Sequence, residues 1–144
     1  MRRAVVVAAV AVAPLWTACT SAAPADGVPA VEWSRSHDDA LARAKAEHRP
    51  ALIEFTADWC VPCQELEERT YPDRQVRQQA ERFVMVRVDA TDPDDDTAAL
   101  MKRYRVYGLP TIVFIDSAGA LLETPRVTGF VEPARFAYLM STVH

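Results

Sequence analysis

The chain has 144 residues, of which 50% are hydrophobic and 25% are charged, and its formal net charge is −4. This length suits one domain with a proper hydrophobic core, and the composition excludes an intrinsically disordered chain. The sequence has no basic patch for phosphate groups, so we expect no nucleic-acid partner.

The first 18 residues have the pattern of a signal peptide. Arg2 and Arg3 precede an apolar run at residues 4–13, which is well below the roughly 20 residues of a membrane span. Residues 15–19 (LWTAC) are similar to a lipoprotein box in which Cys19 is lipidated, and ordinary cleavage after Ala25 is the alternative. Either route takes the protein out of a bacterial cytoplasm, to the periplasm or elsewhere outside the cytoplasmic membrane, with membrane contact only through the lipid.

Residues 19–30 are rich in alanine and proline and predict a flexible leader, so we place the domain at residues 31–144. A short first strand is expected near residues 31–33. Ser36 is a suitable cap for a helix at residues 37–47, which ends before Pro50. The apolar run at residues 51–55 then predicts a buried central strand, interrupted by one charged residue.

Cys60 and Cys63 follow this strand at the start of a predicted helix over residues 60–70. A C-x-x-C at a strand-to-helix junction is typical of a redox site. The unsatisfied N–H groups of a helix N-terminus stabilise a thiolate, and Pro62 fits the first turn because its missing N–H costs nothing there. We interpret Cys60, at the exposed end of the turn, as the attacking thiolate and Cys63 as the resolving thiol.

A zinc site and a structural disulfide are the two alternative interpretations of this cysteine pair. A zinc site usually needs four ligands, but the chain has no second C-x-x-C. Its histidines are scattered, at His37, His48 and His144. A purely structural disulfide would constrain the unfolded chain little, because the loop it closes is so short. We therefore expect a redox pair that needs neither a metal nor an organic cofactor. Apart from Cys19 the chain has no further cysteine to scramble it in an oxidising compartment.

An acidic run at residues 90–96 precedes a predicted helix at residues 97–104. Its aspartates suggest a calcium loop, but the glycine and the distal glutamate of an EF-hand are absent. We therefore interpret the run as a solvated loop that ends as a helix cap.

The remaining elements follow from local signals. In chain order they are a helix capped by Asp73 that ends near residue 80, a strand at 83–88, a strand at 112–115, a hairpin turn at 117–119, its partner strand from residue 121, and a helix from residue 132. This order of helices and strands predicts an α/β domain with a central mixed β-sheet flanked by helices.

Two short motifs, WCVPC at residues 59–63 and LPT at residues 109–111, are similar to those of a known family. They match the W-C-x-x-C site and the cis-proline loop of the thioredoxin superfamily, which the chain therefore resembles. Within the superfamily the chain is similar to the C-terminal, thioredoxin-like domain of the DsbD thiol:disulfide interchange proteins, in the stretches 56–61, 108–112 and 126–130. The resemblance covers about residues 35–140 and implies the thioredoxin fold. Two departures are Pro62, where DsbD-like domains commonly have alanine, and the lack of a multi-helix membrane part.

The resemblance implies a substrate-binding role for four residues. Pro110 is expected to follow a cis peptide bond, with an ordinary trans proline before a strand as the alternative. The backbone groups of Leu109 and Thr111 would border an extended substrate. Trp59 is expected to pack beside the cysteines and shield them.

Two acids complete the expected site. Glu54, six residues before Cys60, occupies the place of the family's buried acid. Burial there would raise the pKa of its carboxyl, so that it could exchange a proton with Cys63. The alternative is an acid that faces solvent at a strand end. Glu67, seven residues after Cys60, matches a second acid of DsbD-like domains, which would tune the thiolate pKa; a plain solvated residue is the alternative.

These features together predict an exported, monomeric thiol:disulfide oxidoreductase of the protein-disulfide reductase type. The resemblance implies that a separate membrane electron donor of the DsbD or CcdA type feeds it, and that other exported thiol/disulfide proteins are its substrates. A disulfide oxidase or isomerase is the first alternative. A non-catalytic, thioredoxin-like metal-binding module is the second.

Overall fold

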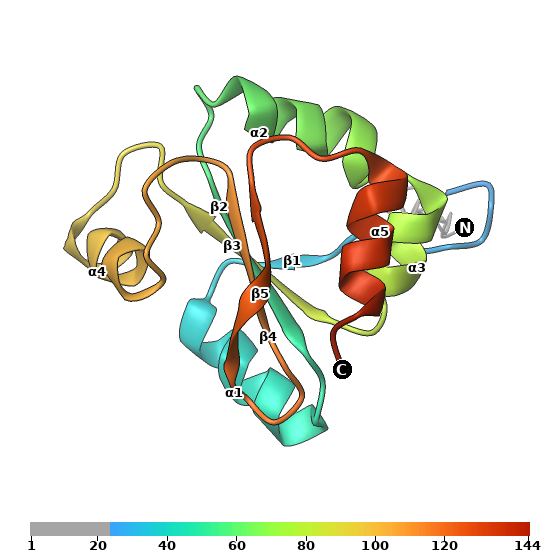
Figure 1. The fold of residues 1–144 in the computed structure, drawn as a ribbon, viewed down its shortest axis with the longest axis horizontal. Helices are drawn as coiled ribbons and strands as arrows, with labels where there is room; N and C mark the ends of the chain where they lie inside the picture. Colours follow the sequence, from blue (N-terminus) through green and yellow to red (C-terminus); the bar gives the residue numbers. More distant parts are fainter. Residues whose placement is uncertain (1–23) are drawn as a thin grey trace, which may run out of the picture.

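Five β-strands form one mixed sheet in the computed structural model, which describes residues 24–144 (Figure 1). Their order across the sheet is β1-β3-β2-β4-β5. The strands are β1 (Trp33–Ser34), β2 (Ala51–Thr56), β3 (Val84–Asp89), β4 (Thr111–Ile115) and β5 (Leu121–Thr128). Strands β1 and β2 run parallel to β3, whereas β4 is antiparallel to β2 and β5 is antiparallel to β4. The predicted mixed sheet is thereby confirmed.

Helices cover both faces of this sheet. They are α1 (His37–Glu47), α2 (Val61–Glu65), the π-helical segment η1 (Leu66–Thr70), α3 (Arg74–Ala80), α4 (Asp95–Arg103) and α5 (Pro133–Ser141). Helices α3 and α5 pack side by side on one face, next to η1 (Figure 1). Helices α1 and α4 pack on the other face. None of the helices in residues 24–144 is long and apolar enough to cross a bilayer.

The central strand β2 is buried on both faces, as its apolar run predicted. Successive side chains of a strand point to opposite faces of the sheet. Leu52 accordingly joins the core beneath α3 and α5, with Val76 and Phe136. Ile53 and Phe55 join the core beneath α1 and α4. The end of β2 therefore has a rigid support on both sides, and this end carries the cysteine pair.

Three helices begin at the caps that the sequence indicated. The Ser36 side chain accepts a hydrogen bond from the Asp39 N–H, and Asp73 accepts one from the Gln75 N–H at 2.8 Å. Asp94 accepts from the Thr97 N–H at 2.8 Å, so the acidic run does end as a helix cap. Helix α4 begins at Asp95, two residues earlier than predicted, because Asp94 is the residue that caps it.

The predicted helix over residues 60–70 changes its winding halfway. An α-helical part, Val61–Glu65, is followed by a π-helical turn, and the Tyr71 N–H donates to the Leu66 carbonyl, five residues back, at 2.9 Å. The wider turn brings Tyr71 back to the side of the helix that Leu66 occupies, and both side chains are buried. Periodicity alone predicted a uniform α-helix because this wider turn depends on where Tyr71 packs in the fold.

The described part of the predicted leader lies against α3. The Arg77 side chain, itself buried, donates to the carboxylate of Asp26, to the carbonyl of Val28 and to the carbonyl of Pro72. Val28 is buried as well. Residues 26–28 thus have fixed partners in the domain, where composition predicted a flexible leader. The predicted signal peptide (1–18) and Cys19 lie outside the described residues.

Candidate active site

The cysteine pair lies where β2 ends and α2 begins. Cys60 and Cys63 form a disulfide, with their Cα atoms 5.2 Å apart. Cys60 is the N-cap of α2, and its carbonyl accepts hydrogen bonds from the N–H groups of Cys63 (3.0 Å) and Gln64 (3.1 Å). Pro62 stands in the first turn, as expected. Cys60 therefore lies at the positive end of the α2 dipole, which favours a thiolate there once the disulfide is reduced.

Both cysteines are buried, and Cys60 is more covered than the sequence suggested. Cys60 is 4% exposed and Cys63 is 2% exposed. The expectation that Cys60 occupies an exposed end of the turn is wrong for this oxidised form, because Ala57 and Leu109 pack against the disulfide. Leu109 comes from a loop far away in the sequence, so local patterns around the cysteines did not indicate this cover.

The loop that supplies Leu109 has the predicted cis peptide bond between Leu109 and Pro110. The Thr111 hydroxyl donates to the Gly108 carbonyl at 2.7 Å, and the Pro110 carbonyl accepts from the Gly129 N–H at 3.1 Å. These bonds hold the loop in place while Leu109 contacts the disulfide. The substrate-binding roles of Leu109, Pro110 and Thr111 stay predictions.

Trp59 is an exposed aromatic residue that is fixed at one end. Its indole N–H donates to the Thr91 carbonyl at 3.1 Å, while the residue as a whole is 64% exposed. Val61, on the other side of Cys60, is exposed too, and Tyr107 in the proline loop is 91% exposed. The structure thus places three exposed apolar side chains in the two segments that contain Cys60 and Pro110. A shielding role for Trp59 stays a prediction.

Glu54 is fully buried within β2. One carboxylate oxygen accepts from the Tyr71 hydroxyl at 2.6 Å, and the other accepts from Arg87 Nε at 2.9 Å. Burial raises the pKa of the Glu54 carboxyl above its ordinary value, although the charge of Arg87 and the hydrogen bond from Tyr71 oppose this effect. The alternative of a solvent-facing acid is therefore wrong, whereas proton exchange with Cys63 stays a prediction.

Arg87 and Tyr71 are the two site residues that sequence analysis missed. Arg87 lies directly opposite Glu54 in the β2–β3 register, and its Nη2 also donates to the carboxylate of Glu67. Glu67 is exposed, but it belongs to this cluster and is not a plain solvated residue. A charged residue within the apolar strand at residues 83–88 was the available signal, but its pairing with Glu54 required the register between strands.

We expect Glu54→Gln to change the pH dependence of stability. A raised pKa means that the native state binds the Glu54 proton more tightly than the unfolded state, so wild-type stability falls relative to the variant as pH rises above about 4.5, the ordinary value. Urea unfolding of both oxidised proteins between about pH 4 and pH 8 measures this difference, with Glu68→Gln, on the exposed side of η1, as a control for the loss of one charge. A difference that stays constant with pH would contradict the assignment.

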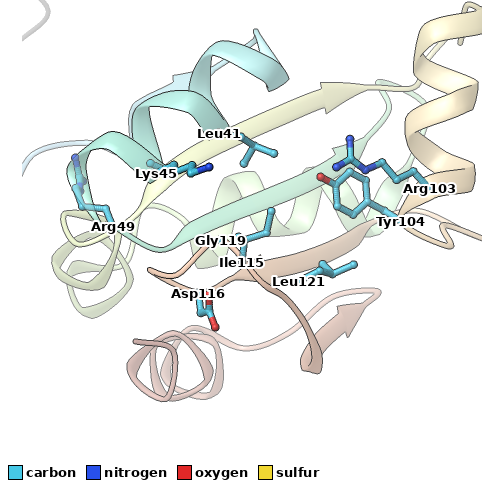
Figure 2. Close-up of a pocket in the computed structure, with 10 residues that line it drawn as sticks. Leu41, Lys45, Arg49, Arg103, Tyr104, Ile115, Asp116, Gly119 and Leu121 are labelled. Carbon is cyan, nitrogen blue, oxygen red and sulfur yellow. The ribbon is translucent and has the colours of Figure 1, made fainter.

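One cavity of the domain lies beside the disulfide, and another lies away from it. A cleft of about 350 Å³ beside the disulfide is lined by Cys63, Gln64, Glu67 and Arg87, among others. A second pocket, of about 200 Å³, lies where α1, the end of α4 and the β4–β5 hairpin meet, and Figure 2 shows Leu41 of α1 on one side and Leu121 on the other. No predicted site residue lines this second pocket, so the first cleft is the one connected with the redox pair.

The three histidines of the chain do not form a cluster with the cysteines. His37 is buried and its Nε2 forms a hydrogen bond with the Tyr104 hydroxyl at 2.9 Å, between α1 and the end of α4. Among residues 24–144, no group of three or more His, Cys, Asp or Glu side chains is arranged to hold a metal ion.

Comparison with known proteins agrees with a thioredoxin-like fold that carries a redox-active cysteine pair. A family model described as thioredoxin-like matches residues 32–117. The thiol:disulfide interchange protein DsbD of Yersinia pestis is 40% identical over 93 residues, which are 65% of this chain and 16% of DsbD. DsbD of Haemophilus influenzae is 38% identical over 101 residues, 70% of this chain and 17% of that protein. The chain thus spans about one sixth of the length of these curated relatives.

Solved structures are similar over about three quarters of this chain. The oxidised C-terminal domain of Neisseria meningitidis DsbD is 30% identical with a TM-score of 0.65, covering 74% of this chain and 92% of that one. A thioredoxin from Thermus thermophilus is 32% identical with a TM-score of 0.67, covering 78% of this chain and 86% of that one. The matched residues include both cysteines and the proline loop. The chain therefore belongs to the thioredoxin-like family.

Proposed function

We propose that this chain is an exported thiol:disulfide oxidoreductase that reduces disulfides in other exported proteins. The observation that carries the proposal is the Cys60–Cys63 disulfide at the N-terminus of α2, with the cis-Pro110 loop packed against it through Leu109. The names of the DsbD relatives, thiol:disulfide interchange proteins, support this class of reaction.

The reaction begins from the reduced dithiol. The Cys60 thiolate attacks one sulfur of a substrate disulfide, so that a mixed disulfide forms and the other substrate sulfur leaves as a thiolate. Cys63 then loses its proton to Glu54 and attacks the Cys60 sulfur. This step closes the Cys60–Cys63 disulfide and releases the second substrate sulfur. Two electrons thereby pass from the dithiol to the substrate.

The substrate is an extended segment that crosses the surface next to Cys60. The backbone groups of Leu109 and Thr111 bind its main chain, because proline between them has no N–H to offer. The exposed side chains of Trp59 and Tyr107 add apolar contact on either side. Because these contacts are mainly to the substrate's main chain, the site would accept disulfides in many different proteins.

Electrons reach the dithiol from a separate membrane donor of the DsbD or CcdA type. The chain acts as a monomer outside the cytoplasmic membrane, after residues 1–18 direct its export. Lipidation of Cys19 holds it at the membrane. These statements rest on the sequence pattern of the first 19 residues and on the kinship with DsbD.

The reduction potential of the Cys60–Cys63 pair tests the direction of electron flow. We expect a value near that of thioredoxin, about −270 mV, in equilibrium with dithiothreitol or glutathione. Quantified thiol alkylation at each ratio of reduced to oxidised buffer gives the potential, and Cys63→Ala, which cannot form the pair, is the control. A value near about −120 mV would instead indicate a disulfide donor and favour the oxidase or isomerase alternative.

A further inference from the structure

Arg87 joins two carboxylates that the sequence treated separately. Its Nε and Nη2 atoms both lie 2.9 Å from one oxygen of the buried Glu54. The same Nη2 donates to the carboxylate of the exposed Glu67, one helical turn beyond Cys63. One guanidinium therefore bridges a buried acid in the sheet and a surface acid on η1.

The position of this guanidinium is fixed by aromatic rings. Arg87 Cζ lies 4.1 Å from the centre of the Trp33 ring and 5.9 Å from that of the Tyr71 ring. Stacking and two-sided hydrogen bonding suit the planar fork of arginine, whereas a lysine ammonium would act as a point charge. Arg87 thus has little freedom to leave the bridge.

Few charged or titratable groups surround Glu54. Strand β3 presents Arg87, η1 presents Glu67, and Tyr71 follows η1, while the neighbouring strand β4 places the apolar Ile112 opposite Glu54. Arg87 is therefore the only cation in contact with Glu54 among the described residues.

The same bridge borders the resolving cysteine. Arg87, Glu67 and Cys63 line one cleft of about 350 Å³. Its other charged lining residues are Arg35, Asp58 and Asp89. Arg87 therefore contacts the buried Glu54 and also borders the cleft that Cys63 lines.

We propose that Arg87 is a positioning residue for the resolving step, and that Glu67 acts on the redox pair through Arg87 and not directly on a thiolate. This inference rests on the proposed reductase function, in which Glu54 accepts the Cys63 proton. Arg87 stabilises the carboxylate form of Glu54, so Glu54 is ready to accept a proton at lower pH than it would be without Arg87. Glu67 has the opposite effect, because it shares the guanidinium and adds a like charge.

The test follows the pH dependence of a single turnover. The reduced wild-type protein and the variants Arg87→Gln, Arg87→Lys and Glu67→Gln are mixed with a fluorescent peptide disulfide between about pH 5 and pH 9, and the decay of the mixed disulfide is measured by acid quench. We expect the inflexion of the Arg87→Gln profile at higher pH than that of wild type. Below the wild-type inflexion its rate should fall by about tenfold for each pH unit by which the inflexion moves, because the ionised fraction of Glu54 falls in that proportion. Arg87→Lys should restore part of the shift, and Glu67→Gln should move the inflexion to lower pH.

A double variant separates the two roles. If Glu67 acts through Arg87, then Glu67→Gln in an Arg87→Gln background moves the inflexion much less than it does alone. An equal shift in both backgrounds, or an Arg87→Gln profile that superimposes on wild type, would overturn the inference and leave the reductase function standing. A wild-type protein that reduces no peptide disulfide would instead remove the proposed function itself. A loss of folded protein would lower the amplitude without moving the inflexion, so the position of the inflexion is the deciding measurement.

Discussion

A Cys60→Ser variant is expected to lose all measurable disulfide reduction, because the hydroxyl that replaces the thiol is not ionised at neutral pH and cannot form a mixed disulfide. Cys60 is the residue at the N-cap of α2, where the helix favours a thiolate. Reduction of insulin or of a peptide disulfide by the dithiothreitol-reduced protein measures the loss.

Cys63→Ala is the matched variant, and it should behave differently. Its Cys60 still attacks the substrate, but no second thiol resolves the product, so a covalent complex with the substrate accumulates. Mass spectrometry under non-reducing conditions detects that complex, which dithiothreitol should release. Reduction that survives Cys60→Ser, or a complex that forms through Cys63 when Cys60 is replaced, would contradict the assigned order of attack.

Phe136→Ala is expected to cause a large loss of stability. Phe136, on α5, is fully buried between the helices and the sheet, and its ring lies 5.8 Å from the ring of Tyr71. Removing a buried phenylalanine side chain typically costs about 3–5 kcal/mol, because it leaves a cavity as well as losing apolar burial. Urea unfolding of the oxidised protein measures the free energy of unfolding.

Tyr138→Ala, two residues further along the same helix, is the control. Tyr138 is 59% exposed, so its replacement should change the free energy of unfolding by no more than about 0.5 kcal/mol. Equal losses in the two variants would mean that α5 does not pack on the sheet through Phe136.

Local sequence signals predicted the elements that form the frame of the site. Ser36 and Pro50 bracket α1, and the strand-to-helix junction gave the place of the cysteine pair. The cis bond before Pro110 came from resemblance to a family, because no local pattern distinguishes it from a trans bond. These features depend on neighbours within a few residues or on a motif that is itself short.

Contacts between residues far apart in the chain could not be predicted from the sequence. Arg87 meets Glu54 across 33 residues, and Arg77 meets Asp26 across 51 residues. Such pairs depend on strand register and on helix packing, which a single sequence does not fix. The π-helical turn at Leu66–Thr70 has the same origin, since it places Tyr71 against Glu54 and Phe136.

The residues that cover the disulfide limit which thiols can reach it. Sulfur exchange needs the incoming thiolate to reach the disulfide along its axis, so its rate depends on access as well as on potential. With Ala57 and Leu109 against the two sulfurs, a small thiol in solution finds little of them exposed, whereas a protein that docks on the surrounding surface has its cysteine guided to Cys60. In the oxidised form the pair is thereby insulated kinetically from small thiols, so that its exchange depends on a protein that docks beside it.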